Sequence, residues 1–220
     1  MQAEIVAALP KSVAGVAVPD TAAAKAAARL CAEHSPGFLY NHCLRTYAFG
    51  RLLMARQGMA CDAELTFIAS ALHDLGLLEP FMTPTQRFEV DGADAARAFA
   101  LEHGFSDAEA DVVWDAIALH TSPGIAVRKQ AEIAFVHIGA GADVCGLGMS
   151  LISPDDVAEV LDAWPRLQCK TQFHRLMLEV CRRKPQAQAL TFTAELGRAH
   201  IHGFACPTFE QLMAAAPFDE

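Results

Sequence analysis

Three short motifs in the sequence contain side chains that can bind a divalent metal ion. They supply His42, the adjacent pair His73 and Asp74, and Asp143, which lies in a stretch of otherwise apolar or small residues. Such polar groups are costly to bury unless something pairs them. Two imidazoles and two carboxylates suit Zn²⁺, Fe²⁺ or Mn²⁺. We therefore predict that His42, His73, Asp74 and Asp143 bind a divalent ion, either Zn²⁺, Fe²⁺ or Mn²⁺.

Each motif taken singly also has a purely structural interpretation. His42 could be a core histidine with satisfied hydrogen bonds, and Asp143 could cap a helix or form an ion pair. His73 could bond the last carbonyls of a helix while Asp74 caps the following turn. Because the four side chains together form one plausible ligand set, we favour the metal site.

Several neighbouring residues could take part in chemistry at such a site. His120 shares the inward face of its helix with Val113 and Ile117, so it could be a base or substrate donor, a packed core residue, or a ligand of a second metal. Thr121 could donate a hydrogen bond to substrate. Arg45, one turn after His42, could orient a carboxylate ligand, bind an anion, or be solvated.

The elements that must position these residues are helical. The hydrophobic period of 3.6 residues and the capping residues predict helices, and no strand alternation is evident. We expect an all-α, single-domain helical bundle over 20–220, preceded by an arm over 1–19, with the metal site within 38–148. Helices are expected over 21–34, 41–57, 62–76, 92–103, 112–120, 132–145, 155–164, 168–183 and, more weakly, 208–215. Gly139 lies on the same helical face as Asp143 and permits close approach of another helix.

Composition limits the class of protein and its partners. The chain has 220 residues, 53% of them hydrophobic, and a net charge of −9, which argues against nucleic acid or an anionic membrane as partner. Seven scattered cysteines without a C-x-x-C pair indicate reduced thiols. Neither a signal peptide nor a membrane-spanning run is evident. We expect a cytoplasmic protein that acts on a small molecule, and the sequence also allows a homo-oligomer.

The order and spacing of the four ligands resemble those of the HD-domain metalloenzymes. In that family a histidine on one helix precedes a His-Asp pair by about thirty residues, and a distant aspartate follows. The likeness covers roughly Phe38 to Gly148. It is nearest to the cyanamide hydratase-like branch, through the segments Asn41–Tyr47, Leu72–Gly76, Arg87–Ala93, Ala116–Thr121 and Asp143–Gly146.

The resemblance implies an activity. Members of that branch bind one metal ion, usually zinc, and convert cyanamide to urea, so we expect a metal-bound hydroxide to add water to a small nitrile-like substrate. Asp74 or His120 would accept and transfer the proton in this reaction. The resemblance also implies that the segment containing Glu89 closes over the metal, with Glu89 contacting substrate or relaying protons. A second interpretation of Glu89 is a negative charge favoured at a helix N-terminus.

Two other functions compete with the hydratase. One is hydrolysis of a small phosphomonoester or nucleotide, the commoner activity among HD proteins, for which Arg45, Arg87 and Arg128 are among the candidate phosphate ligands. The other is a metal-stabilised module without catalysis. The loop over 79–90, with Pro80 and Pro84, is long enough to line the mouth of a site, which argues against the module.

Overall fold

The computed structural model describes residues 9–218, and the fold is all-α as expected. The predicted helices all form, although several boundaries differ by a few residues. The helices are α1 (Ala22–His34), α2 (Gly37–Arg56), α3 (Ala63–Leu72), α4 (Phe88–Glu102), α5 (Asp107–Ala118), α6 (Ala131–Cys145), α7 (Pro154–Ala163), α8 (Cys169–Arg183), α9 (Phe192–His200) and α10 (Phe209–Ala214). Short 3₁₀ turns lie at η1 (Leu75–Leu77), η2 (Ala126–Arg128), η3 (Met149–Leu151) and η4 (Gln186–Gln188).

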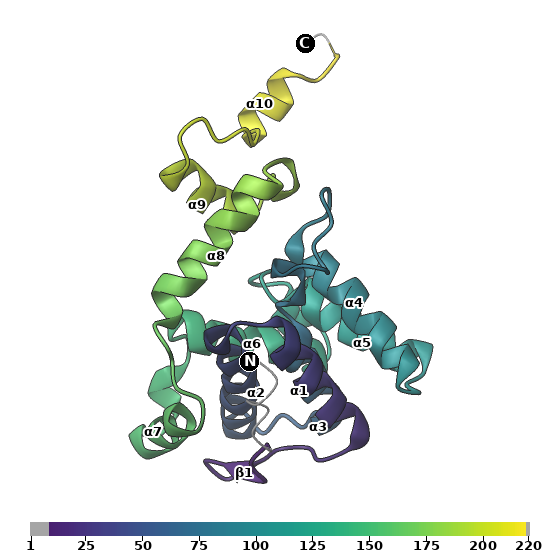
Figure 1. Cartoon of the computed structure of the whole chain (residues 1–220), viewed down its shortest axis with the longest axis vertical. Helices are drawn as coiled ribbons and strands as arrows, with labels where there is room; N and C mark the ends of the chain where they lie inside the picture. Colours follow the sequence, from purple (N-terminus) through teal and green to yellow (C-terminus); the bar gives the residue numbers. More distant parts are fainter. Residues whose placement is uncertain (1–8, 219–220) are drawn as a thin grey trace.

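The long helices α2 and α6 pack closely against each other in the middle of the molecule (Figure 1). Gly139 makes this approach possible, because a Cβ atom there would lie 2.1 Å from the carbonyl oxygen of Thr46. The predicted role of this glycine is thereby confirmed. Asp143 follows one turn later on α6, and the close crossing brings it beside His42 on α2.

A second close approach fixes the end of α3 against α4. A Cβ atom at Gly76 would lie 1.9 Å from the carbonyl oxygen of Phe88, so only glycine fits there. We expected the α3 helix to continue to Gly76, but it ends at Leu72 and the chain continues into the 3₁₀ turn η1. Similarly, α4 begins at Phe88 rather than at Gly92. The His73-Asp74 pair therefore lies between two helical elements.

The predicted N-terminal arm contains a small β-hairpin that the sequence analysis missed. Strands β1 (Ser12–Val13) and β2 (Val16–Ala17) pair antiparallel through a turn in which Ala14 and Gly15 have φ angles of 50° and 72°. Strands of two residues are too short to show alternation. The hydroxyl of Tyr47 donates to the carbonyl of Ala17 at 3.1 Å, so the hairpin packs on α2. Residues 1–8 of the predicted arm lie outside the described residues, and the division into an arm and one domain stays a prediction.

The C-terminal helices leave the central bundle. In Figure 1, α8 runs diagonally above α2 and α6, and α9 and α10 continue toward the top of the view, where α10 stands clear of the rest. Helix α9 was not predicted, although Thr191 before Phe192 is a residue type favoured at helix starts. Among the described residues, no helix is long and apolar enough to cross a membrane.

Candidate metal centre

His42 is buried on α2, and a carboxylate orients its ring. Its Nδ1 atom lies 2.7 Å from Oδ2 of Asp143. An ionised carboxylate can only accept a hydrogen bond, so Nδ1 carries the proton and donates it. The lone pair of His42 Nε2 is then free, and this atom lies 3.2 Å from Nε2 of His73. His42 therefore presents Nε2 as a potential ligand atom.

His73 and Asp74 lie where the chain leaves α3. Asp62 begins this helix, its side chain accepting from the backbone N–H of Leu65, and the helix ends at Leu72. His73 Nδ1 donates to the carbonyl of Ser70 at 2.8 Å, which again leaves Nε2 with a free lone pair. Because the backbone departs from the α-helix here, the two adjacent side chains converge, and His73 Nε2 lies 3.3 Å from Asp74 Oδ2.

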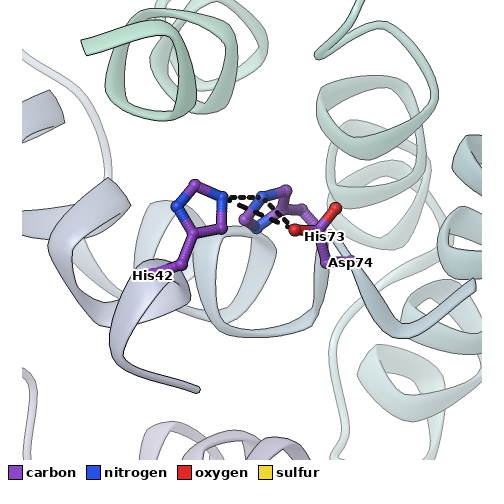
Figure 2. Close-up of side chains that lie close together, drawn as sticks. All are labelled: His42, His73 and Asp74. Carbon is purple, nitrogen blue, oxygen red and sulfur yellow. Dashed lines mark hydrogen bonds and ion pairs between the residues drawn. The ribbon is translucent and has the colours of Figure 1, made fainter. Parts of the chain in front are cut away.

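Three ligand atoms form a nearly equilateral triangle (Figure 2). Nε2 of His42 lies 3.2 Å from Nε2 of His73 and 3.5 Å from Oδ2 of Asp74, and the third side measures 3.3 Å. Bonds of about 2.0–2.1 Å at tetrahedral angles would place neighbouring ligand atoms about 3.3–3.4 Å apart. The spacing in the protein therefore matches one face of a tetrahedral metal site.

The chemistry of the triangle also fits a cation. The two nitrogens present lone pairs, and both oxygens of Asp74 are buried without a hydrogen-bond partner among the described residues. Three acceptor atoms that face one another without a donor repel, and a bound cation would remove this repulsion. The residues present therefore fit a divalent metal ion.

The electrostatic field at this point favours positive charge. Burial would raise the pKa of Asp74, but His73 and then His42 outweigh this effect and lower the pKa to about 2. Burial also lowers the pKa of His73, but the adjacent charge of Asp74 outweighs it, so the net pKa is raised. Both shifts have the same cause, because the ionised Asp74 carboxylate favours positive charge at this point, either a proton on His73 or a bound cation.

Asp143, the fourth predicted ligand, lies behind His42 and is not part of the triangle. The buried guanidinium of Arg45 forms two bonds with its carboxylate, Nε to Oδ1 at 2.7 Å and Nη2 to Oδ2 at 2.8 Å. Burial would raise the pKa of Asp143, but hydrogen bonds from His42 and Arg45 hold it well below its ordinary value. Direct ligation by Asp143 stays a prediction.

Arg45 has the contacts of a residue that orients a carboxylate. Besides its two bonds to Asp143, its Nη1 donates to the carbonyls of Trp164 and Pro165 at 3.0 and 3.2 Å. Every guanidinium nitrogen therefore has a partner inside the protein. These contacts favour the orienting role over substrate binding, which was the other prediction for Arg45.

His120 lies on the far side of Asp74. Its Nε2 is 3.9 Å from Asp74 Oδ1, and its ring packs edge-on against that of His73. Nδ1 donates to the carbonyl of Ile117 at 2.6 Å, so Nε2 is the atom available for proton transfer. Burial, followed by the charge of His73, lowers the pKa of His120 to about 4, which keeps the imidazole neutral near pH 7. This geometry places His120 beside the triangle but outside it.

Glu89 and Thr121 belong to a second polar cluster next to His120. The buried carboxylate of Glu89 accepts from Thr121 Oγ1 at 2.5 Å and from Arg87 Nη2 at 2.6 Å. Phe88 connects this cluster to the centre, because its ring packs edge-on against that of His120 at a centroid distance of 5.7 Å. Glu89 and Thr121, each predicted to contact substrate, thus contact each other, with Arg87 as a third member, and their roles toward substrate stay predictions.

The sequence analysis missed three residues of the C-terminal segment that contact the site or its surroundings. Arg166 Nη1 donates to Asp143 Oδ1 at 2.7 Å, and the ring of Phe173 packs edge-on against His42 at 5.5 Å. Lys184 forms a buried ion pair with Asp91 near the start of α4. Such contacts cross more than twenty residues of sequence, and no local pattern signals them.

Comparison with known families agrees with this geometry. The family model of the HD domain matches residues 39–145, which contain His42, His73, Asp74 and Asp143. The match covers just under half of the chain and, together with the histidine and aspartate cluster, agrees with the resemblance of this segment to HD-domain proteins. A search of curated proteins finds no match to the chain. The helices from α7 onward lie outside the matched segment.

Proposed function

We propose that the chain is a metal-dependent hydrolase that binds one divalent ion through His42 Nε2, His73 Nε2 and Asp74. The observation that carries this proposal is the triangle of three potential ligand atoms with sides of 3.2–3.5 Å. Two imidazole nitrogens and a carboxylate oxygen are a common ligand set for catalytic zinc, with iron or manganese as alternatives. A site with three protein ligands keeps a position for water or substrate.

The side chains around the ion would transfer protons and bind substrate. A bound divalent ion lowers the pKa of water so that it can act as a nucleophile near pH 7. His120, neutral and with Nε2 toward Asp74, would take the proton from the attacking water and return it to the product. The hydroxyl of Thr121 donates to Glu89, so its oxygen would accept a hydrogen bond from substrate.

For the substrate, we propose a small nitrile-like molecule such as cyanamide. Water adds across the carbon–nitrogen triple bond, the oxygen bonds to carbon, and the nitrogen takes two protons in total, which gives an amide, or urea from cyanamide. The support is the resemblance to the cyanamide hydratase-like branch and the enclosure of the site, where His42, His73 and Asp74 are each at most 1% exposed. An enclosed site beside Phe88 and Phe173 suits a small uncharged molecule.

Phosphomonoester hydrolysis is the second candidate, and one observation favours it. Arg87 is 38% exposed at its side chain and also reaches Thr121 Oγ1 at 3.3 Å, so it could contact a phosphate close to His120. Hydrolysis would break the phosphorus–oxygen bond and release inorganic phosphate and an alcohol.

One experiment separates these functions. Purified protein is analysed for bound metal and assayed for urea from cyanamide and for phosphate from a panel of phosphomonoesters. Asp74→Asn should lose both metal and activity, whereas His120→Ala should keep the metal and lose about 10²–10⁴-fold in turnover. Asp162→Asn, an exposed residue on α7, is the matched control and should resemble wild type.

The outcomes differ for each candidate. Urea formation with no phosphate release supports the hydratase, and the reverse supports the phosphohydrolase. Bound metal with neither product would favour a non-catalytic module. A wild-type protein that binds no divalent ion at stoichiometric concentration contradicts the proposal as a whole.

A further inference from the structure

The short helix α10 has an apolar face without a partner in residues 9–218. Phe209, Leu212 and Met213 follow the i, i+3, i+4 spacing that places side chains on one side of a helix. They are 61%, 43% and 57% exposed. Every residue from Phe209 to Phe218 is exposed, and Figure 1 shows α10 standing clear of the other helices.

A helix of this kind needs a partner to be stable. It has only 6 residues, and isolated helices shorter than about 12–15 residues are marginal in water. Its start is nevertheless well defined, because Thr208 and Gln211 form a complete capping box. A defined helix with a solvent-exposed apolar face is typical of a segment that docks into a groove.

The same chain contains a groove of the matching character. A pocket of about 230 Å³ lies where α8, α9 and the end of α6 meet. Its apolar wall includes Val144, Phe173, Met177, Phe192 and Leu196. Phe192 is 41% exposed and Val144 is 38% exposed, so this surface is also incompletely covered. We refer to it as the α8–α9 groove.

Charge complements the apolar match. Among residues 9–218, Arg166, Lys170 and His174 line the groove and no acidic residue does, although the chain has nine more acidic than basic side chains. Arg166 shares the single carboxylate of Asp143 with Arg45, which leaves one positive charge in excess there. In the segment Phe209–Phe218, which we call the C-terminal arm, Glu210 is the single charged residue. The acidic, apolar helix α10 and the basic, apolar α8–α9 groove are therefore complementary.

We propose that α10 of one copy docks into the α8–α9 groove of a second copy, and that the exchange is reciprocal. Because every chain has both the groove and α10, two copies related by a twofold axis can each dock α10 into the groove of the other. The groove shares Phe173 with the candidate metal centre, where this ring packs against His42. If the proposed function holds, the partner's arm covers the outer side of that centre, but the dimer itself does not depend on it.

The mass of the full-length protein in solution tests the proposal. Sedimentation equilibrium or light scattering should give twice the chain mass at micromolar concentration. Met213→Asp on α10 should raise the dimer dissociation constant about ten-fold or more, because a carboxylate would enter an apolar groove. Leu101→Asp is the matched control, since Leu101 is 38% exposed on α4, far from both surfaces in sequence, and should stay dimeric.

A mixing experiment separates loss of docking from loss of folding. Met213→Asp has an intact groove and a defective arm, and the double variant Val144→Asp/Lys170→Glu has an intact arm and a defective groove. Each should be monomeric alone, while an equimolar mixture should form heterodimers through one intact arm and one intact groove. A wild-type protein that stays monomeric, a dimer that Met213→Asp leaves unchanged, or a mixture without heterodimer overturns the proposal.

Discussion

Asp143 differs from the other three predicted ligands in how its oxygens are used. Oδ1 accepts from Arg45 Nε and Arg166 Nη1, and Oδ2 accepts from Arg45 Nη2 and His42 Nδ1. An ionised carboxylate has about four lone-pair positions, so all of them have a donor. In this arrangement Asp143 fixes the ring of His42 and sets which nitrogen is free, as carboxylates behind a ligating histidine do.

At the residue scale we therefore predict different effects of two isosteric changes. Asp143→Asn should weaken metal binding about 10–100-fold, because residues behind a ligand have effects of this size. Asp74→Asn should abolish stoichiometric binding, because it removes a corner of the triangle. Competition with a chromophoric chelator measures both affinities. If Asp143→Asn loses metal as completely as Asp74→Asn, Asp143 binds the ion directly, as its position in the sequence predicts.

At the element scale, α8 is fixed to the rest of the protein at both ends. Near its start, Asn41 Nδ2 donates to the carbonyl of Pro165 at 2.8 Å, and Arg166 binds Asp143. Just past its end, Lys184 pairs with Asp91, which also accepts from the backbone N–H and hydroxyl of Thr83. A helix outside the family match thus covers the candidate centre and anchors the loop before α4.

The ion pair at the end of α8 gives a stability prediction. Lys184→Met should lower the free energy of unfolding by about 3–5 kcal/mol, because it leaves the buried carboxylate of Asp91 without its cation. The double variant Lys184→Met/Asp91→Asn should recover much of this loss, since no unpaired charge remains. Urea unfolding measures both, with the exposed Lys25→Met as control. Equal losses in the single and double variants would contradict this account.

The two tyrosines of α2 give a pH prediction. Burial raises the pKa of Tyr40 and of Tyr47 to about 12 from the ordinary value of 10.0. The folded protein therefore keeps protons that the unfolded chain releases between pH 10 and pH 12. Their contribution to stability is complete below pH 10 and is lost as the pH rises toward 12.

Absorbance at 295 nm tests this expectation, because the chain has only these 2 tyrosines. Folded protein should show little tyrosinate at pH 11, and the signal should appear together with unfolding. Tyr47→Phe, which removes the hydroxyl that donates to Ala17, should reduce the alkaline loss of stability. Titration of both tyrosines near pH 10 in folded protein would disprove the prediction.

At the scale of the whole molecule, metal binding should stabilise the fold. The triangle joins α2 to the end of α3, and the acceptor atoms repel one another when no cation is present. At a free metal concentration about 1,000 times the dissociation constant, binding should add about 4 kcal/mol to the free energy of unfolding. Thermal unfolding with Zn²⁺, and with a chelator, measures this shift. His73→Ala should abolish it, and an unchanged midpoint in wild type would argue against the site.

The sequence by itself determined the helical class, and it also predicted the three residues that the structure brings together in the candidate metal centre. Local hydrophobic period and capping residues are properties of neighbouring positions, so α1, α6 and α7 are predicted almost to the residue. His42, His73 and Asp74 were also predicted, because polar residues on apolar helical faces stand out without any structure. The hairpin and α9 were missed, since two-residue strands and a short helix carry too few positions to show a period.

Only the tertiary structure shows which hydrogen-bond partners the carboxylates of Asp74 and Asp143 have. Asp74 and Asp143 are both carboxylates in apolar helical surroundings, and nothing local distinguishes them. Two guanidinium groups reach Asp143 across long sequence separations, 98 residues for Arg45 and 23 for Arg166, while Asp74 has no guanidinium partner among residues 9–218. Hydrogen bonds between residues so far apart in sequence depend on helix packing, and therefore on the whole chain. For the same reason, the position of α8 over the candidate metal centre could not be predicted from the sequence.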